Sequence, residues 1–148
     1  MSRRWHEAWS DDLTTTFDVA SLRDGRQALV VNEERRAAAG LVFDPRGRTL
    51  SALPALPVCS STGPACEVAE GVLGAIRGLP SKREFVALLN LAQGGWVAGP
   101  LLPRGTRTRV MAQHGDRVFF FCLREQPTRT REVLVASAEA LRSHAQPG

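Results

Sequence analysis

The spacing of apolar and polar residues predicts a central helix over residues 79–95. Four apolar positions recur at helical intervals and would share one face: Phe85, Leu88, Leu89 and Ala92. Ser81 followed three residues later by Glu84 is typical of a capping box, and Gly94 can adopt the left-handed conformation that closes a helix. The pattern therefore predicts a core helix that a sheet must cover.

The residues before this helix predict another helix and a β-hairpin. Residues 19–39 are compatible with a helix broken near Asp24-Gly25. Residues 44–47, Asp-Pro-Arg-Gly, are a turn sequence, with a strand beginning at residue 41 and a returning strand over residues 48–56. Pro54 and Pro57 each remove a backbone donor, so this returning strand is expected at a sheet edge.

The stretch from Ala65 to Leu79 fits two interpretations. Its apolar residues follow a helical stripe, and periodicity alone favours a helix. Gly71 and Gly74 would each cost about 1 kcal/mol inside a helix. In a strand, a glycine would mark a bulge or a close approach of another segment.

The residues after the central helix predict a short extended piece at Trp96–Ala98, a hairpin and a terminal helix. The hairpin pairs residues 107–113 with 117–125 around His114-Gly115-Asp116, and the helix covers residues 130–144. The second hairpin strand is apolar on both faces, so we expect one face in the core and the other against a helix or a second protomer. Its candidate core or dimer residues are Val118, Phe119, Phe120, Phe121 and Leu123.

Length and composition predict one ordinary globular domain. The chain has 148 residues, 43% of them hydrophobic and 23% charged, which suffices for a core without disulfides. We assign residues 1–18 to a poorly determined N-terminal segment and residues 19–145 to the domain. We expect a cytoplasmic location, with neither a signal peptide nor a membrane span. The three cysteines are expected to be reduced.

The basic charge does not by itself predict a nucleic-acid partner. The net charge is +4, and Lys82 is the only lysine among the basic residues. Residues 104–131 are locally rich in arginine. Residues 119–121, three consecutive phenylalanines, are interpreted as core rather than as aromatic groups for stacking on bases. Nucleic-acid binding is kept as an alternative, through Arg104, Arg107, Arg109 and Arg117.

No catalytic set is visible in the sequence. His6, His114 and His144 are far apart, and Cys59 and Cys66 have no neighbouring ligand pair for zinc. The glycines lack the spacing of a phosphate-binding loop. We therefore expect no enzymatic activity, no metal and no cofactor.

Two short motifs carry a resemblance to a known family. Residues 41–48, Leu-Val-Phe-Asp-Pro-Arg-Gly-Arg, and Leu79-Pro80 directly before the predicted helix resemble landmarks of the small class I chaperones of bacterial type III secretion. The final strand and helix are similar too, so the resemblance covers roughly residues 33–145. It implies an α+β fold: helix, three strands, helix, two or three strands, helix, with an antiparallel sheet covered by helices, in a dimer. It also favours the strand over the helix for residues 65–79.

The resemblance implies a non-enzymatic, homodimeric chaperone that binds the N-terminal segment of a secreted effector, a virulence function. Partner contacts would lie on the edge strand with the prolines, at Leu50, Leu53, Leu56 and Val58. The alternative is a Roadblock-type homodimeric scaffold for a GTPase or motor, in which residues 65–77 form a helix. A basic nucleic-acid-binding module is the third hypothesis.

Overall fold

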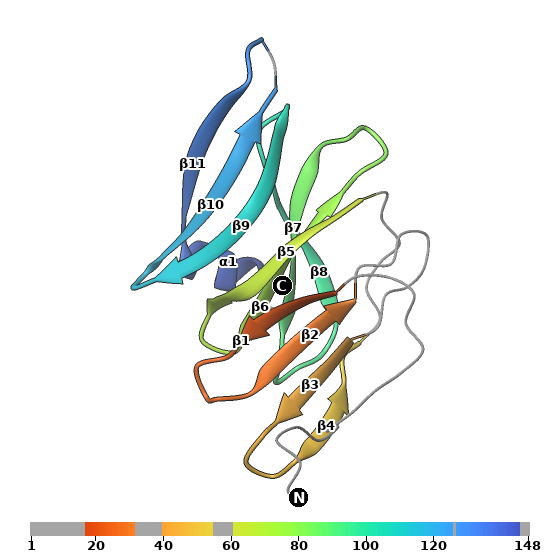
Figure 1. Cartoon of the computed structure of the whole chain (residues 1–148). Coiled ribbons are helices and arrows are strands. Elements are labelled where there is room, and N and C mark those ends of the chain that lie inside the picture. Colours follow the sequence, from red (N-terminus) through yellow and green to blue (C-terminus); the bar gives the residue numbers. More distant parts are fainter. Residues whose placement is uncertain (1–16, 32–39, 55–60, 126, 146–148) are drawn as a thin grey trace, which may run out of the picture.

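The computed structural model describes residues 17–31, 40–54, 61–125 and 127–145, which form antiparallel strands and one short helix (Figure 1). The elements are β1 (Phe17–Ser21), β2 (Gln27–Val31), β3 (Gly40–Asp44), β4 (Thr49–Ala52), β5 (Ser61–Ala69), β6 (Val72–Gly78), β7 (Glu84–Asn90), β8 (Trp96–Leu101), β9 (Thr106–His114), β10 (Arg117–Arg124), β11 (Thr130–Ser137) and α1 (Ala138–Ala145).

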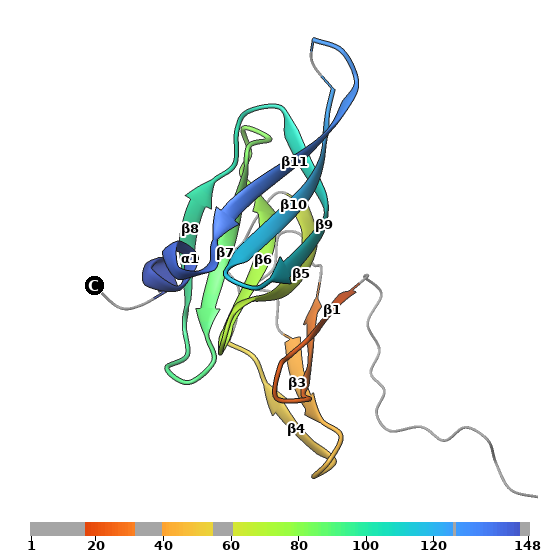
Figure 2. The same cartoon turned by 90° about the vertical axis from the view of Figure 1, so that its left-hand side faces the viewer.

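The strands form three sheets, and the middle one lies between the other two. The N-terminal sheet has the order β1-β2-β3-β4, the central sheet β5-β6-β7-β8, and the C-terminal sheet β11-β10-β9. One core cluster joins the central sheet to the C-terminal sheet and α1, and a second joins it to the N-terminal sheet. Figure 1 separates the three sheets, and in Figure 2 the C-terminal sheet lies in front of the central sheet, with the N-terminal sheet below.

The central sheet is apolar on both faces because both faces are covered. Residues that alternate along β6 and β7 divide between the two clusters. The residues in the cluster shared with the C-terminal sheet are Val72, Ile76, Val86 and Leu88. The residues in the cluster shared with the N-terminal sheet are Leu73, Ala75, Ala87 and Leu89.

The predicted α+β fold with a central helix is wrong. Residues 79–95 form a turn, strand β7 and a second turn. The apolar run in β7 contains the helical spacing by coincidence, because a strand buried on both faces is apolar at nearly every position. Glu84 does not cap a helix: it is buried, and its carboxylate accepts a hydrogen bond from the backbone N–H of Thr108 in β9.

The other predicted helices are also corrected. The described part of residues 19–39 is the β1–β2 hairpin, which turns at Gly25 with φ of 95°. Residues 130–137 form β11, and only Ala138–Ala145 are helical, with the Ser137 hydroxyl accepting a hydrogen bond from the backbone N–H of Ala140. Residues 32–39 lie outside the described residues.

Other expectations are confirmed. Turns occupy residues 45–48 and 115–116, each between paired strands. Residues 65–79 are not helical, as the resemblance favoured over periodicity, but they form the end of β5, a turn at Glu70-Gly71 and β6 rather than one strand. Gly71 lies in the β5–β6 turn with φ of 74°, and a Cβ on Gly74 would lie 2.6 Å from Val68 Cγ1. In the part of the chain that the structure describes, no helix has the length and apolarity to cross a membrane.

Candidate binding surface

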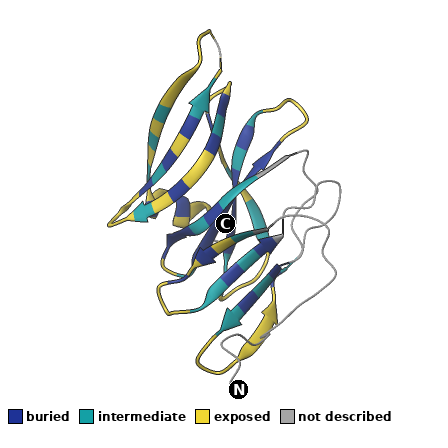
Figure 3. Ribbon diagram, in the orientation of Figure 1, coloured by how far each residue is buried: buried dark blue, intermediate teal, exposed yellow. Residues whose placement is uncertain are grey.

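The C-terminal sheet has one face in the core and one face open to solvent. Along β10, the residues of the inner face pack in the core cluster: Val118, Phe120 and Cys122. Phe119 and Phe121 alternate with them and lie on the outer face. Figure 3 shows the same alternation of buried and exposed residues along β9 and β10.

Two rows of apolar side chains cross this face. The strand register places Phe119 between Ala112 and Val135, and Phe121 between Val110 and Val133. We call these six residues the apolar outer face. The next row along the strands is Arg107, Leu123 and Arg131.

The apolar outer face leaves substantial apolar surface in water. Four of its side chains are about half exposed: Val110, Phe121, Val133 and Val135. Complete burial of one such side chain is worth about 1.5–3 kcal/mol, so covering the exposed half of all four would contribute about 3–6 kcal/mol. Contiguous exposed apolar surface of this kind marks interaction sites in soluble proteins.

The structure separates the candidate residues predicted from the sequence. In the proposed dimer strand, Val118 and Phe120 are buried in the core, whereas Phe121 is 43% exposed. Phe119 and Leu123 are half-buried on the outer face. The interpretation of Phe119 and Phe121 as core is therefore wrong, because the sheet is covered on one side only among the described residues.

The structure describes two of the four predicted partner-binding residues, and these two differ in exposure. Leu50 on β4 is 43% exposed, but Leu53 is 7% exposed and belongs to the core cluster of the N-terminal sheet. Leu56 and Val58 lie outside the described residues. Sequence reasoning missed the residues of β9 and β11 that complete the apolar outer face.

Arginines lie at both ends of the apolar outer face. Residues 104–131 hold seven arginines against Asp116 and Glu125, a net charge of +5, although the whole chain carries only +4. Arg117 lies at one end of the sheet, 4.0 Å from Asp116, and Arg107 and Arg131 lie in the row beyond Phe121. Protein interfaces commonly have an apolar centre and a polar rim, and arginine is enriched in them.

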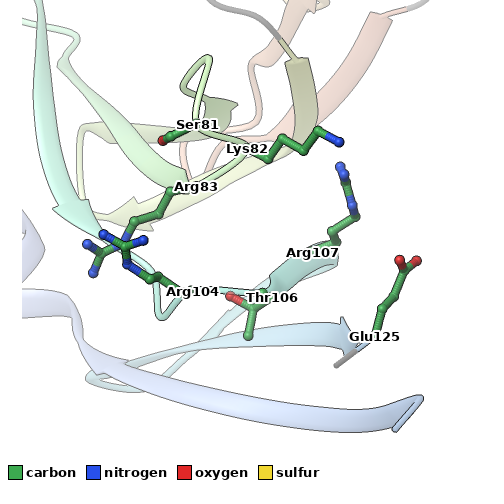
Figure 4. Close-up of a pocket in the computed structure, with 8 residues that line it drawn as sticks. Ser81, Lys82, Arg83, Arg104, Thr106, Arg107 and Glu125 are labelled. Carbon is green, nitrogen blue, oxygen red and sulfur yellow. The ribbon is translucent and has the colours of Figure 1, made fainter. Parts of the chain in front are cut away.

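A basic pocket of about 260 Å³ lies near the row of Arg107, between the β6–β7 turn and the β8–β9 turn. Its lining residues are Ser81, Lys82, Arg83, Arg104, Gly105, Thr106, Arg107 and Glu125. Figure 4 shows Lys82 and Arg107 extending to one side of the pocket, and Arg83 and Arg104 to the other. Four cations against one carboxylate, divided between two sides, suit the pocket to a ligand with more than one anionic group.

Buried Glu84 connects the central sheet to the strand that carries Arg107. Its Oε1 accepts a hydrogen bond from the Thr108 N–H at 2.7 Å, beside the β-bulge in β9. Burial raises the pKa of the Glu84 carboxyl, while the hydrogen bonds from Thr108 and the charges of Arg107 and Arg109 oppose that rise. Glu84 thus satisfies a backbone donor where the ladder between β9 and β10 is irregular.

The described residues show no reactive constellation. They contain no group of three or more His, Cys, Asp or Glu side chains that could hold a metal ion. His114 and His144 are exposed on different elements. Cys66 and Cys122 are free thiols; burial raises the pKa of Cys66 to about 12 and also raises that of Cys122, so both are thiols at neutral pH. His6 and Cys59 lie outside the described residues.

Comparisons with known proteins show a fold neighbour but no family. No family model and no curated protein matches the chain. The structure is similar to that of polysaccharide lyase Uly1, with a TM-score of 0.53 and 16% sequence identity. The match covers 84% of this chain and 28% of the lyase chain, so this chain corresponds to a fraction of that protein. At this identity, the similarity concerns the fold alone.

Proposed function

We propose that the chain is a non-enzymatic binding module that holds a polypeptide segment on the apolar outer face of its C-terminal sheet. The observation that carries this proposal is the half exposure of Val110, Phe121, Val133 and Val135 in adjacent rows. The segment would place apolar side chains over these rows and acidic side chains against the arginines at their ends.

Charge complementarity favours a different polypeptide over a second copy of this chain. Two copies packed face to face would bring their arginine-rich rims together, and like charges across an interface cost several kcal/mol. The four half-exposed side chains are also few compared with the 20–30 residues per partner of a standard stable interface. An acidic and apolar segment meets neither difficulty.

A single-stranded nucleic acid is the other macromolecule that this face could attract. Phe119 and Phe121 stand two residues apart on β10 with arginines beyond them, an arrangement that suits base stacking. The aliphatic side chains in the same rows have no π-face for stacking, and they favour apolar side chains as the occupant. Nucleic-acid binding is therefore an outcome that the test must distinguish.

The sequence resemblance points to the same class of partner, although the fold that it implied is not that of this chain. A chaperone for a secreted effector would also bind an extended, partly apolar polypeptide. The chaperone role, the homodimer and the type III secretion partner stay predictions.

The test is a selection of binders from a display library of random peptides, followed by affinity measurements on variants. We expect the selected peptides to be apolar with acidic flanks. Phe121→Ser should weaken their binding by about 2 kcal/mol or more, roughly 30-fold in Kd, as for truncation of a central aromatic contact. Val133→Thr changes polarity at nearly constant shape and preserves strand propensity, and it should weaken binding without unfolding the sheet.

Leu50→Ser is the matched control, because Leu50 and Phe121 have the same 43% exposure on different sheets. It should leave the affinity within twofold. Equal losses in the two serine variants would contradict the assignment of the site. If the wild-type protein is a dimer and Val133→Thr dissociates it, the occupant of the apolar outer face is a second copy of this chain. If oligothymidylate binds more tightly than any selected peptide, the occupant is a single-stranded nucleic acid.

A further inference from the structure

The cations that line the basic pocket form no close ion pair with the described residues. Among the described residues, none of the lining cations Lys82, Arg83, Arg104 and Arg107 lies within 4 Å of a carboxylate oxygen. The Arg83 Nε donates to the Leu102 carbonyl at 2.9 Å, which anchors that side chain at the pocket. The nearby Arg124 is paired instead with Glu132, at 2.9 Å.

Lys82 has an unusual backbone conformation for the residue that it is. The β6–β7 connection is closed by hydrogen bonds from Lys82 N–H to the Leu79 carbonyl and from Leu79 N–H to the Arg83 carbonyl, at 2.8 and 2.9 Å. Lys82 occupies the left-handed region of this turn with φ of 68°, where glycine would be unstrained. This turn places Lys82 in the lining of the pocket, opposite the β8–β9 turn.

The pocket lies at the basic end of the apolar outer face. Arg107 lines the pocket and is also in register with Leu123, in the row next to Phe121. A segment lying on the apolar outer face and continuing past this row would bring its next residues to the pocket. Arginine guanidinium groups match carboxylates with paired hydrogen bonds.

We propose that this pocket binds the carboxylates of a short acidic stretch, at one end of the polypeptide segment held on the apolar outer face. The inference rests on the proposed function for the source of the acidic stretch. The pocket chemistry can be tested separately, because a small acidic peptide reaches the pocket without any apolar contact.

The test uses Lys82, the only lysine in the sequence, as a reporter. The whole protein is acetylated with an N-hydroxysuccinimide ester, and mass spectrometry of the peptide around Lys82 gives the rate at that side chain. Tetraglutamate with an acetylated N-terminus, at tenfold its Kd, should slow acetylation of Lys82 about tenfold, since only the free fraction of the protein reacts. Tetraglutamine with the same blocked N-terminus, at equal ionic strength, should have no effect.

Arg104→Gln should raise the tetraglutamate concentration needed for protection about tenfold, as expected for loss of a charged hydrogen-bonding partner. Arg48→Gln removes the same charge from the exposed β3–β4 turn and should change nothing. For peptides selected on the apolar outer face, Lys82→Gln should weaken binding only where the peptide has an acidic end. Arg48 also has positive φ, 53°, so Arg48→Gln controls for both charge and backbone conformation in that comparison.

Protection by tetraglutamine equal to that by tetraglutamate would overturn the proposal, as would equal effects of Arg104→Gln and Arg48→Gln. Stronger protection by tetragalacturonate than by tetraglutamate would overturn the assignment to a polypeptide, in favour of an acidic sugar chain. Selected peptides that bind the apolar outer face but are insensitive to Arg104→Gln would refute this inference alone. Protection by tetraglutamate without any selected apolar peptide would refute the proposed function and leave the pocket as an acidic-ligand site.

Discussion

Replacing Gly74 by alanine tests the packing of the central sheet. A Cβ at this position would lie 2.6 Å from Val68 Cγ1, 3.4 Å from Val86 Cγ1 and 3.6 Å from Met111 Cε. Carbon atoms pack best at about 3.5–4.0 Å, so Val68 must move by about 1 Å. Val68 is fully buried, and its branched side chain has few alternative rotamers.

This overlap should destabilise the protein by about 1–3 kcal/mol, the usual cost of an extra methyl group in a packed core. The sign of this stability change distinguishes a strand from a helix over residues 65–79, because Gly74→Ala would stabilise a helix by about 1 kcal/mol. Urea unfolding monitored by fluorescence gives the free energy of unfolding from the midpoint and slope. Gly47→Ala is the control: its Cβ would lie 3.5 Å from Thr49 Cγ2, an ordinary contact, and stability should change by less than about 0.5 kcal/mol.

A double-mutant cycle with Val68→Ala identifies the cause. Val68→Ala alone should cost about 1.5–3 kcal/mol for lost burial. In the double variant the alanine methyl at position 74 occupies space that the valine vacates. The combined loss should therefore be at least about 1 kcal/mol smaller than the sum of the two single losses. Additive losses, or a Gly74→Ala protein more stable than wild type, would refute the close approach of β5 and β6.

Three further predictions concern buried groups. Burial raises the folded-state pKa of Glu84, so its ionisation destabilises the fold as the pH rises from about 4.5 through the raised pKa. The stability of Glu84→Gln relative to wild type should therefore increase across that pH range, as measured by urea unfolding at each pH. A stability difference that stays constant with pH would contradict this. Leu53→Ala should lower the free energy of unfolding by about 2–5 kcal/mol, and Leu50→Ala should lower it by less than about 1 kcal/mol, because only Leu53 is buried. Thermal unfolding compares the two variants, and equal losses of stability would contradict their different burial. In the folded protein, iodoacetamide should alkylate partly buried Cys66 and buried Cys122 only slowly, because the pKa of each thiol is raised. Mass spectrometry measures the rates, and rapid labelling without unfolding would contradict this.

Turns were the most predictable part of the fold because their causes are local. At residues 44–47, the Asp44 carboxylate accepts a hydrogen bond from the Arg46 N–H at 3.0 Å, as aspartate commonly does in a turn. Gly115, with φ of 61°, allows the tight connection between β9 and β10. Such features depend on a few adjacent residues, and the sequence displays them directly.

Strand β7 could not be identified from apolar periodicity. Its continuous apolar run satisfies a helical stripe and a doubly buried strand equally well, and only the cover on both faces decides between them. The Ser81 and Glu84 pair imitated a helix cap, although Glu84 in fact bonds to Thr108 from a different sheet. The unbroken apolar run, residues 85–89, has the length of a strand and is shorter than a typical helix, and this was the signal that favoured a strand.

The candidate binding surface was visible in the sequence only in parts. Residues 118–123 were recognisable as apolar on both faces, but the pattern does not reveal which face is covered. The pocket combines residues 81–83 with residues 104–107, which the pairing of β7 with β8 brings together across the sheet edge. The excess of arginine over residues 104–131 was the available clue to a basic surface.

The most direct test of the binding surface is a methyl NMR spectrum of valine-labelled protein, recorded with and without a selected peptide. The methyl signals of Val110, Val133 and Val135 should shift on binding. Those of Val19 on β1 should not, although Val19 and Val135 are equally exposed at 51%. Shifts confined to Val19 and the rest of the N-terminal sheet, with the β9 and β11 valines unchanged, would contradict the proposed binding surface.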